Sequence, residues 1–277
     1  MGKSRTQTQV AISDDHHAWF LLNTSPDLRL QIEATAALHP CGKGRQSPIA
    51  GVLLTSGDID QVAGLLSLRE LQPFRIYCTA SIRRILREQN SVFGMLNRVP
   101  DQVEWTEVDS NANFLLTAIA GANSGIACTV FSLGSRYPPY VSPEQSKSLR
   151  AEEALLGVVA TSSSGMLLAY MPAVPVVDDA LLKRLADTDL LLFDGTFWSD
   201  DELIRVQGSG STARAMGHIP VSGAEGSLRK LAELQRPRKV FVHINNTNPM
   251  LDESGPEHAA VRNAGWEIAE DGWSLDL

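Results

Sequence analysis

Short, continuous runs of apolar residues recur along the chain, and polar loops follow them. The clearest runs are Ile49–Leu54, Leu190–Phe193 and Lys239–Val242. Apolar runs of roughly four to eight residues are typical of strands that are buried on both faces of a sheet. The pattern therefore predicts three buried strands at these positions. Shorter runs predict a hairpin over residues 10–12 and 19–22, strands at 74–78, 155–160 and 166–170, several more between 99 and 133, and two at 266–277.

Helical patterns alternate with the predicted strands. Ser25 followed by Pro26 is a typical helix start, with serine as the N-cap and proline at the first helical position. Predicted helices run from there to residue 36, and over residues 62–69, 81–89, 178–185 and 226–235. This alternation predicts an α/β protein with two sheets packed face to face and helices outside, built as a single domain over residues 1–277. The alternative is an open doubly wound sheet, and the adjacent strands between residues 99 and 170 argue against it.

Composition narrows the classes of function. The chain has 277 residues, of which 43% are hydrophobic, and its 24 Lys and Arg against 32 Asp and Glu give a net charge of −8. An acidic chain without a basic block is a poor candidate for binding nucleic acid or anionic membranes. No apolar run is long enough to span a bilayer, and the polar N-terminus lacks a secretory signal. Three scattered cysteines fit a reducing compartment, so a cytoplasmic protein is expected.

Polar residues that could bind a metal or move protons follow or end the three buried strands. Asp58 and Asp60 follow the first, Asp194 ends the second and His243 follows the third. If the strands are parallel, these residues gather at one edge of a sheet, where sites in α/β proteins lie. Taken singly, each residue is more often part of a turn, a cap or a structural hydrogen bond. Together, two carboxylates and a histidine form a facial set with open positions, which favours non-haem Fe(II), whereas zinc usually takes more His or Cys.

Three longer segments resemble the coenzyme PQQ synthesis protein B (PqqB) family. They are Phe193–Trp198, Met216–Pro220 and the highly specific string His243-Ile244-Asn245-Asn246-Thr247-Asn248-Pro249. Shorter matches are Asn23–Asp27, Gly64–Leu66, Leu68–Glu70 and Tyr137–Tyr140, and the resemblance runs in unbroken order from about Arg5 to Leu277. It implies a metallo-β-lactamase-like αββα four-layer sandwich, with the site at one edge of the two sheets.

The resemblance also implies a place in the biosynthesis of pyrroloquinoline quinone (PQQ), which is made from a precursor peptide with a crosslinked Glu–Tyr pair. One view of the family makes it an iron-dependent hydroxylase of the tyrosine ring of this precursor. The alternative is a carrier or transport-related binding protein for PQQ or its precursor towards the periplasm. We prefer the hydroxylase, because a chain without a membrane span forms no transport path by itself. A zinc hydrolase retained from the fold is a third reading. The expected partners are the Glu–Tyr-derived precursor, other proteins of the pathway and a second copy of the chain.

The metal loop departs from the usual pattern of the fold. The usual Thr-His-x-His-x-Asp-His reads Thr55-Ser56-Gly57-Asp58-Ile59-Asp60-Gln61 here. The two histidines of the first metal site are absent, whereas Asp60, Asp194 and His243 match ligands of the second. The resemblance therefore implies one divalent metal, Fe(II) in preference to zinc, and not a two-metal hydrolase site. Gln61 stands where relatives often keep a histidine, and it offers only a weak neutral oxygen.

Other residues take their expected roles from the same resemblance. His218 matches a site histidine near the substrate, where it would act as a catalytic residue that orients the substrate or moves a proton. Arg69 and the loop with Asn245 and Asn246 would hold substrate carboxylates. Relatives usually begin with an extra strand and a Cys-x-Cys-x-x-Cys segment that this sequence lacks. The fold is therefore expected without that strand, which would leave a sheet edge open to a partner.

Overall fold

Two compact units make up the chain in the computed structural model, which describes residues 3–40, 46–68, 72–119, 121 and 123–276. One unit is Gln9–Gly165, and the other joins Met1–Thr8 to Met166–Leu277. The single domain over residues 1–277 stays a prediction. Cys78 and Cys128 are buried free thiols, whereas Cys41 lies outside the described residues. Burial raises the pKa of the Cys128 thiol to about 12, so this side chain acts as a small apolar residue of the core.

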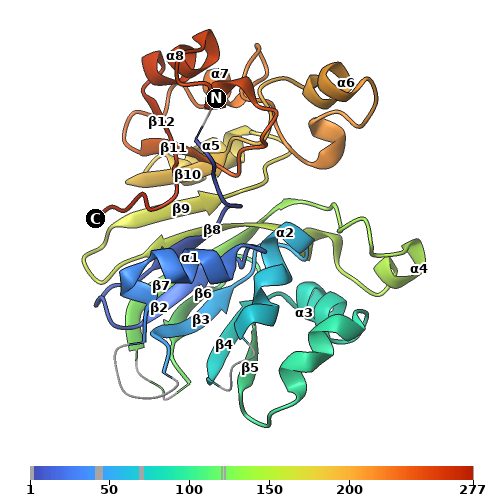
Figure 1. Ribbon diagram of the computed structural model, residues 1–277, viewed down its shortest axis with the longest axis vertical. Helices are drawn as coiled ribbons and strands as arrows, with labels where there is room; N and C mark the ends of the chain where they lie inside the picture. Colours follow the sequence, from blue (N-terminus) through green and yellow to red (C-terminus); the bar gives the residue numbers. More distant parts are fainter. Residues whose placement is uncertain (1–2, 41–45, 69–71, 120, 122, 277) are drawn as a thin grey trace. The chain divides into compact units, whose positions relative to one another are not determined.

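A five-stranded sheet belongs to the Gln9–Gly165 unit (Figure 1). Its strands are β1 (Val10–Ile12), β2 (Trp19–Leu22), β3 (Ile49–Leu53), β4 (Phe74–Cys78) and β5 (Val103–Glu107), in that order. β1 and β2 are antiparallel, which confirms the predicted hairpin, while β2 to β5 are parallel. β3 is buried along almost its whole length, as its unbroken apolar run predicts.

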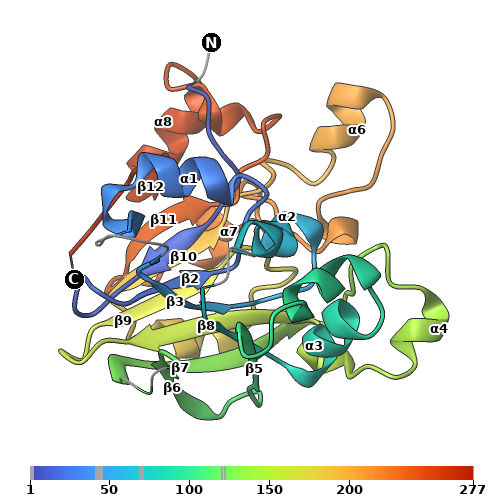
Figure 2. The same cartoon turned by 60° about the horizontal axis from the view of Figure 1, so that its bottom comes forward.

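Short helices accompany this sheet: α1 (Leu28–Ala34), α2 (Ile59–Val62), α3 (Ala80–Arg87) and α4 (Pro143–Ser146). α3 lies beside β5 in both views, where the guanidinium of Arg87 stacks over the ring of Trp105 (Figures 1 and 2). The side chain of Thr79 caps α3, and the carboxylate of Glu153 accepts the amide of Ser81 at 2.9 Å. Both contacts satisfy backbone amides that a helix start leaves without an intrahelical partner.

The remaining strands of this unit are antiparallel. β6 (Asn113–Thr117) pairs with β7 (Asn123–Gly134), and β7 pairs with β8 (Leu155–Thr161). These strands confirm the strand-rich stretch that the sequence predicts after residue 99. They also argue against the open doubly wound alternative, because the sheet of such a fold is mostly parallel.

Parallel strands form the sheet of the unit that contains Met166–Leu277. β9 (Leu167–Met171), β10 (Leu190–Asp194), β11 (Arg238–Val242) and β12 (Trp266–Ile268) lie in the order β12-β11-β10-β9, coloured yellow to red in Figure 1. The register of β10 and β11 pairs Asp194 with Val242, so Asp194 and His243 leave the sheet at the same edge. The structure therefore confirms the parallel orientation that the predicted convergence of these two residues needs.

Four helices accompany these strands in the described residues: α5 (Asp179–Leu185), α6 (Glu202–Gln207), α7 (Ser227–Lys230) and α8 (Pro256–Asn263). α8 lies beside β12 (Figure 2), and Phe241 stacks on Trp266 with ring centroids 4.1 Å apart. This stacking joins β11 to β12 inside the core. Among the described residues, no helix is both long enough and apolar enough to cross a membrane.

Two predicted helix starts differ from the structure. α1 begins at Leu28 and not at Ser25, because the Ser25 hydroxyl accepts the amide of Asp27 in a turn that precedes the helix. The helix predicted from residue 62 begins earlier, as α2, and continues as a 3-10 helix over Ala63–Leu68. At α1, a local hydrogen bond outside the apolar pattern precedes the first helical turn.

Two further elements are shorter than predicted. The helix expected over residues 226–235 is only α7, and one strand, β12, forms in the described part of 266–277 where two were predicted. Gly272, with φ of 77°, turns the chain after β12. A left-handed glycine favours a turn over a continuing strand, and an apolar pattern does not reveal such a turn.

Candidate metal centre

Three side chains of the unit that contains Met166–Leu277 offer ligand atoms that all lie within 4.8 Å of one another. They are Asp194, His218 and His243, and no other such group of acidic, histidine and cysteine side chains occurs in the described parts of the chain. Asp194 is completely buried, His218 is nearly so and His243 is partly exposed. A carboxylate with two imidazoles is a donor set that divalent transition metals bind. The chemistry of these residues therefore fits one metal ion.

The backbone aims the two histidines from loops that follow regular elements. His243 comes directly after β11 in a left-handed conformation, with φ of 53°, and its amide donates to the Thr8 hydroxyl at 2.7 Å. His218 follows Gly217, whose φ of 89° ends a 3-10 helix over Arg214–Met216. Its amide then donates to the carbonyl of Ala213 at 2.9 Å. A non-glycine residue with positive φ at such a place marks strained backbone that the surrounding contacts hold.

Hydrogen bonds fix the carboxylate of Asp194 on both oxygens. Oδ1 accepts the amide and the hydroxyl of Thr196, at 3.0 and 2.6 Å. Oδ2 accepts the amide of Val174 at 2.9 Å and lies 2.9 Å from Nδ1 of His218. A buried carboxylate needs partners of this kind, and they leave it a single orientation.

The Thr196 hydroxyl joins all three members of the cluster. Besides Asp194 Oδ1, its Oγ1 lies 2.7 Å from Nδ1 of His243 and 3.0 Å from Nδ1 of His218. A hydroxyl has one hydrogen and two acceptor sites, and a carboxylate only accepts. The hydroxyl therefore donates to Asp194 and accepts from Nδ1–H of His243, while Nδ1–H of His218 is shared between this hydroxyl and Oδ2 of Asp194. Each imidazole then carries its proton on Nδ1 and its lone pair on Nε2, the tautomer in which Nε2 binds a metal.

Aromatic contacts hold the two imidazole rings parallel. The rings of His218 and His243 stack with centroids 5.4 Å apart and an angle of 13° between their planes. The buried ring of Phe197 meets His218 edge-on at 5.8 Å. Phe197 therefore supplies an apolar contact to the His218 ring.

The loops after β10 and β11 are tied to each other. The amide of Asn245 donates to the Thr196 carbonyl at 3.1 Å, and the Asn248 side chain donates to the Gly195 carbonyl at 2.9 Å. The buried carboxylate of Glu202 accepts the Trp198 amide and the Thr247 hydroxyl, both at 2.6 Å. Glu202 therefore connects the loop that carries Asp194 to the loop that carries His243.

We expect Glu202→Ala to lower the free energy of unfolding of the metal-free protein. The substitution removes the carboxylate that accepts the part-buried Trp198 amide and Thr247 hydroxyl, and each lost hydrogen bond to a charged group costs about 1.5–3 kcal/mol. Chemical denaturation followed by circular dichroism measures the change. Glu233→Ala, at an exposed glutamate of the same unit, is the matched control and should change the free energy by less than about 0.5 kcal/mol. If both variants are equally stable, Glu202 does not connect the two loops as described.

The other site residues that the sequence predicts are not members of the Asp194 cluster. Asp60 and Gln61 lie on α2 of the Gln9–Gly165 unit, so their approach to the Asp194 cluster stays a prediction. Arg69 lies outside the described residues. The side chain of Asn245 donates to Thr247 at 2.9 Å within its own loop, and Asn246 is exposed. The substrate role of these three residues stays a prediction.

Sequence reasoning missed Thr196 and Glu202. Thr196 belongs to the Phe193–Trp198 segment that carries the resemblance, but no pattern shows that one hydroxyl meets two distant histidines. Glu202 has the sequence of an ordinary first-turn glutamate of a helix. The structure also places His218 within ligand distance of Asp194 and His243, so a ligand role stands beside the catalytic role that the resemblance implies.

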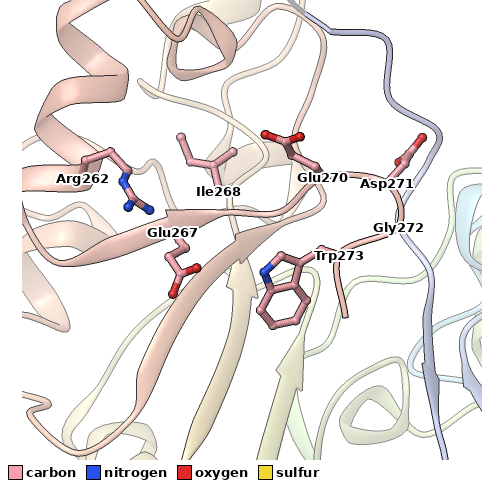
Figure 3. Close-up of a pocket in the computed structure, with 7 residues that line it drawn as sticks. All are labelled: Arg262, Glu267, Ile268, Glu270, Asp271, Gly272 and Trp273. Atoms are coloured by element: carbon pink, nitrogen blue, oxygen red, sulfur yellow. The ribbon is translucent and has the colours of Figure 1, made fainter. Parts of the chain in front are cut away.

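A surface pocket of about 420 Å³ lies in the same unit, apart from the cluster residues (Figure 3). Its lining is mostly charged and comprises Arg262, Glu267, Ile268, Glu270, Asp271, Gly272 and Trp273. Ion pairs already hold its acidic groups, with Arg238 on Glu267 at 2.6 Å and Lys3 on Glu270 at 3.0 Å. These partners lower the pKa of the Glu267 and Glu270 carboxyls. Carboxylates held in surface ion pairs do not indicate a catalytic site.

Comparisons with known proteins agree with this architecture. Residues 18–244 match the family model described as the beta-lactamase superfamily domain. The coenzyme PQQ synthesis protein B of Methylobacterium sp. (strain 4-46) is 42% identical over 99% of this chain and 89% of its own length. The protein of the same name from Xanthomonas oryzae pv. oryzae is 39% identical, with 99% and 88% covered.

A solved structure shows the same fold. The crystal structure of Zn²⁺-bound PqqB from Methylobacterium extorquens superimposes with a TM-score of 0.90 at 40% sequence identity, covering 100% of this chain and 89% of that one. Two sheets with helices, as found in the described residues, are the architecture of the metallo-β-lactamase fold, which confirms the predicted fold class. This chain therefore belongs to the coenzyme PQQ synthesis protein B family of the β-lactamase superfamily.

Proposed function

We propose that this chain is an iron- and O₂-dependent hydroxylase of the tyrosine ring in the Glu–Tyr-derived precursor of PQQ. Membership of the family supports a role in PQQ biosynthesis. The observation that carries the reaction class is the cluster of Asp194, His218 and His243. Two histidines and one carboxylate that leave positions open are the ligand set typical of non-haem Fe(II) oxygenases.

Iron is proposed on the composition of this cluster. A relative's crystal structure is of a Zn²⁺-bound protein, and this chain has its own cluster of candidate ligands, so the two together support a divalent metal. Zinc has no redox chemistry, whereas a ferrous ion held by the cluster would supply the activation of O₂. Asp60 is proposed as a further ligand from the metal loop.

The chain's own residues would prepare the site for this ion. Asp194 is held in one orientation by its hydrogen bonds, and Thr196 together with Asp194 sets the two imidazoles to present Nε2. His218 would orient the phenol or move its proton, unless the ion occupies its Nε2. Phe197 would exclude water where its ring contacts His218.

The proposed reaction balances without an external reductant. One atom of O₂ is inserted into a C–H bond beside the phenol oxygen, and the ring is oxidised through the catechol to the ortho-quinone. The other atom leaves as water with the two hydrogens that the catechol loses. The ring therefore gives up the four electrons that reduce O₂ completely.

The test uses protein reconstituted with Fe(II) without oxygen and then mixed with O₂ and a Glu–Tyr-derived substrate. We expect O₂ uptake together with a product whose mass has gained one oxygen atom and lost two hydrogens, as the ortho-quinone requires. Protein loaded with zinc and the Asp194→Ala variant are the controls. Uptake no faster than in these controls, with iron bound to the wild-type chain, would contradict the hydroxylase. Tight binding of the substrate without turnover would indicate a carrier instead.

A further inference from the structure

Gln61 belongs to a buried hydrogen-bonded chain in the Gln9–Gly165 unit that begins at a backbone amide. The amide of Thr55 donates to Oδ1 of Asn23 at 2.8 Å. Nδ2 of Asn23 donates to the Thr55 hydroxyl at 2.8 Å and, through a second short contact, to Oε1 of Gln61. Nε2 of Gln61 donates to Oδ2 of Asp60 at 3.1 Å. Asn23 and Thr55 are completely buried, and Gln61 is nearly so.

The donors and acceptors in this series of hydrogen bonds determine which way the Gln61 side-chain amide faces. A backbone N–H only donates, so the Asn23 atom facing the Thr55 amide must be its oxygen. The other end of the Asn23 amide is then the NH₂ group, which requires an acceptor on Gln61. Oε1 of Gln61 therefore faces Asn23, and Nε2 faces the carboxylate of Asp60. A flipped Gln61 would set two donors against each other and two acceptors against each other.

The backbone supports the same arrangement. Asn23 has φ of 64°, a left-handed conformation that asparagine adopts more readily than most residues. The amide of Thr24 donates to the carbonyl of Gln61 at 2.7 Å, which fixes α2 against the loop after β2. Rotating Oε1 of Gln61 away would therefore leave the buried NH₂ group of Asn23 without this acceptor, which disfavours such a rotation.

We infer that Gln61 is a positioning residue for Asp60 and not a metal ligand. Its NH₂ group holds the carboxylate of Asp60, while Asn23 holds its carbonyl oxygen. A partner behind a ligating carboxylate orients that ligand in many metal sites. These hydrogen bonds do not depend on the proposed reaction. Their effect on metal affinity rests on the proposed function, in which Asp60 is a ligand.

Zinc affinity of the Asn23→Gly variant separates the two roles of Gln61, because they predict opposite results. Glycine keeps the left-handed backbone and removes only the side chain. If Gln61 orients Asp60, the loss of the Asn23 side chain should free Gln61 and weaken zinc binding by roughly 10–100-fold. Gln61→Met should weaken zinc binding to a similar extent. The double variant should then lose little more than either single variant, because both changes act on one chain of contacts. If Gln61 were a ligand, freeing its carbonyl from Asn23 would leave zinc affinity unchanged or raise it. Competition with a chromophoric chelator measures the affinity, and circular dichroism checks the fold.

A second readout needs neither metal nor activity. In metal-free protein with labelled glutamine side chains, the NH₂ resonances of Gln61, assigned by their loss in Gln61→Met, should shift when Asp60→Ala removes their acceptor. Gln102 is the matched reference, because it is also buried and donates its side-chain amide to the Leu68 carbonyl at 3.1 Å. Its resonances should not move.

Zinc should shift the Gln61 side-chain carbonyl carbon no more than that of Gln102. The inference would be overturned if the NH₂ resonances of Gln61 did not shift in Asp60→Ala. It would also be overturned if zinc shifted the Gln61 carbonyl resonance selectively. Zinc affinity that does not depend on Asp60 would also overturn it, even if the hydroxylase activity were observed.

Discussion

Asp194→Ala is expected to abolish tight metal binding. Asp194 supplies the only carboxylate of the cluster in the described residues, and its oxygens fix Thr196 and His218 as well. The substitution therefore removes a ligand and also frees the groups that orient the others. We expect the dissociation constant for zinc or Fe(II) to rise by more than about 100-fold, beyond the roughly 10–100-fold typical of an outer partner. Chelator competition under anaerobic conditions measures it.

The control for this substitution lies one residue before the same strand. Asp189 precedes β10, pairs with Arg236 at 3.0 Å, accepts the Leu167 amide at 2.8 Å and is no member of the cluster. Asp189→Ala should therefore leave metal affinity unchanged. Asp194→Asn keeps the size of the side chain and should also bind metal poorly, which separates loss of the ligand from loss of the fold. Retention of wild-type affinity by a folded Asp194→Ala or Asp194→Asn protein would exclude Asp194 as a ligand.

Thr196→Val is expected to weaken metal binding by roughly 10–100-fold while leaving all three cluster residues in place. Valine has the shape of threonine but lacks the hydroxyl that accepts from both Nδ1–H groups. Without this acceptor, the His243 imidazole is no longer held by Thr196 in the tautomer that presents Nε2, whereas Nδ1 of His218 keeps Oδ2 of Asp194 as a partner. Chelator competition measures the affinity, and ring-nitrogen chemical shifts of labelled histidine report the tautomers in the metal-free protein.

Two further variants make the Thr196 result specific. Thr196→Ser keeps the hydroxyl and should restore most of the affinity. Thr188→Val removes another buried hydroxyl of the same unit, one that donates to the Leu185 carbonyl at 2.7 Å, and should leave the affinity unchanged. If Thr196→Val binds metal as tightly as the wild-type protein, or if the tautomer of His243 is unaltered, the hydroxyl does not set the imidazole.

The sequence predicts most of the strands because their residues are buried on both faces. β4 forms over the predicted residues 74–78, and β10 extends the predicted run of leucines by only one residue, Asp194. Such runs need no knowledge of the partner strand. Helix ends are less predictable, because single hydrogen bonds set them. The turn at Ser25 delays α1, although Ser25 and Pro26 have the pattern of a helix start.

The convergence of Asp194 and His243 also follows from the sequence, because both residues end apolar runs and parallel strands align their carboxyl ends. His218 could be found only through the resemblance, since it lies in an irregular segment without periodicity. Thr196 and Gln61 show what a sequence leaves out. Their roles depend on partners that are 22 and 38 positions away in the chain, and only the folded backbone brings these partners within hydrogen-bonding distance.

X-ray absorption of the Fe(II)-reconstituted chain, combined with metal analysis of the same sample, tests the central claim that one ion binds at the Asp194 cluster. We predict one iron per chain, with scattering from at least one imidazole and no metal–metal distance. The imidazole scattering should disappear, and the iron should be lost, in His243→Ala. Two ions per chain with a metal–metal vector of about 3.5–4 Å, as in two-metal hydrolases, would contradict the account. So would iron that His243→Ala retains in an unchanged environment.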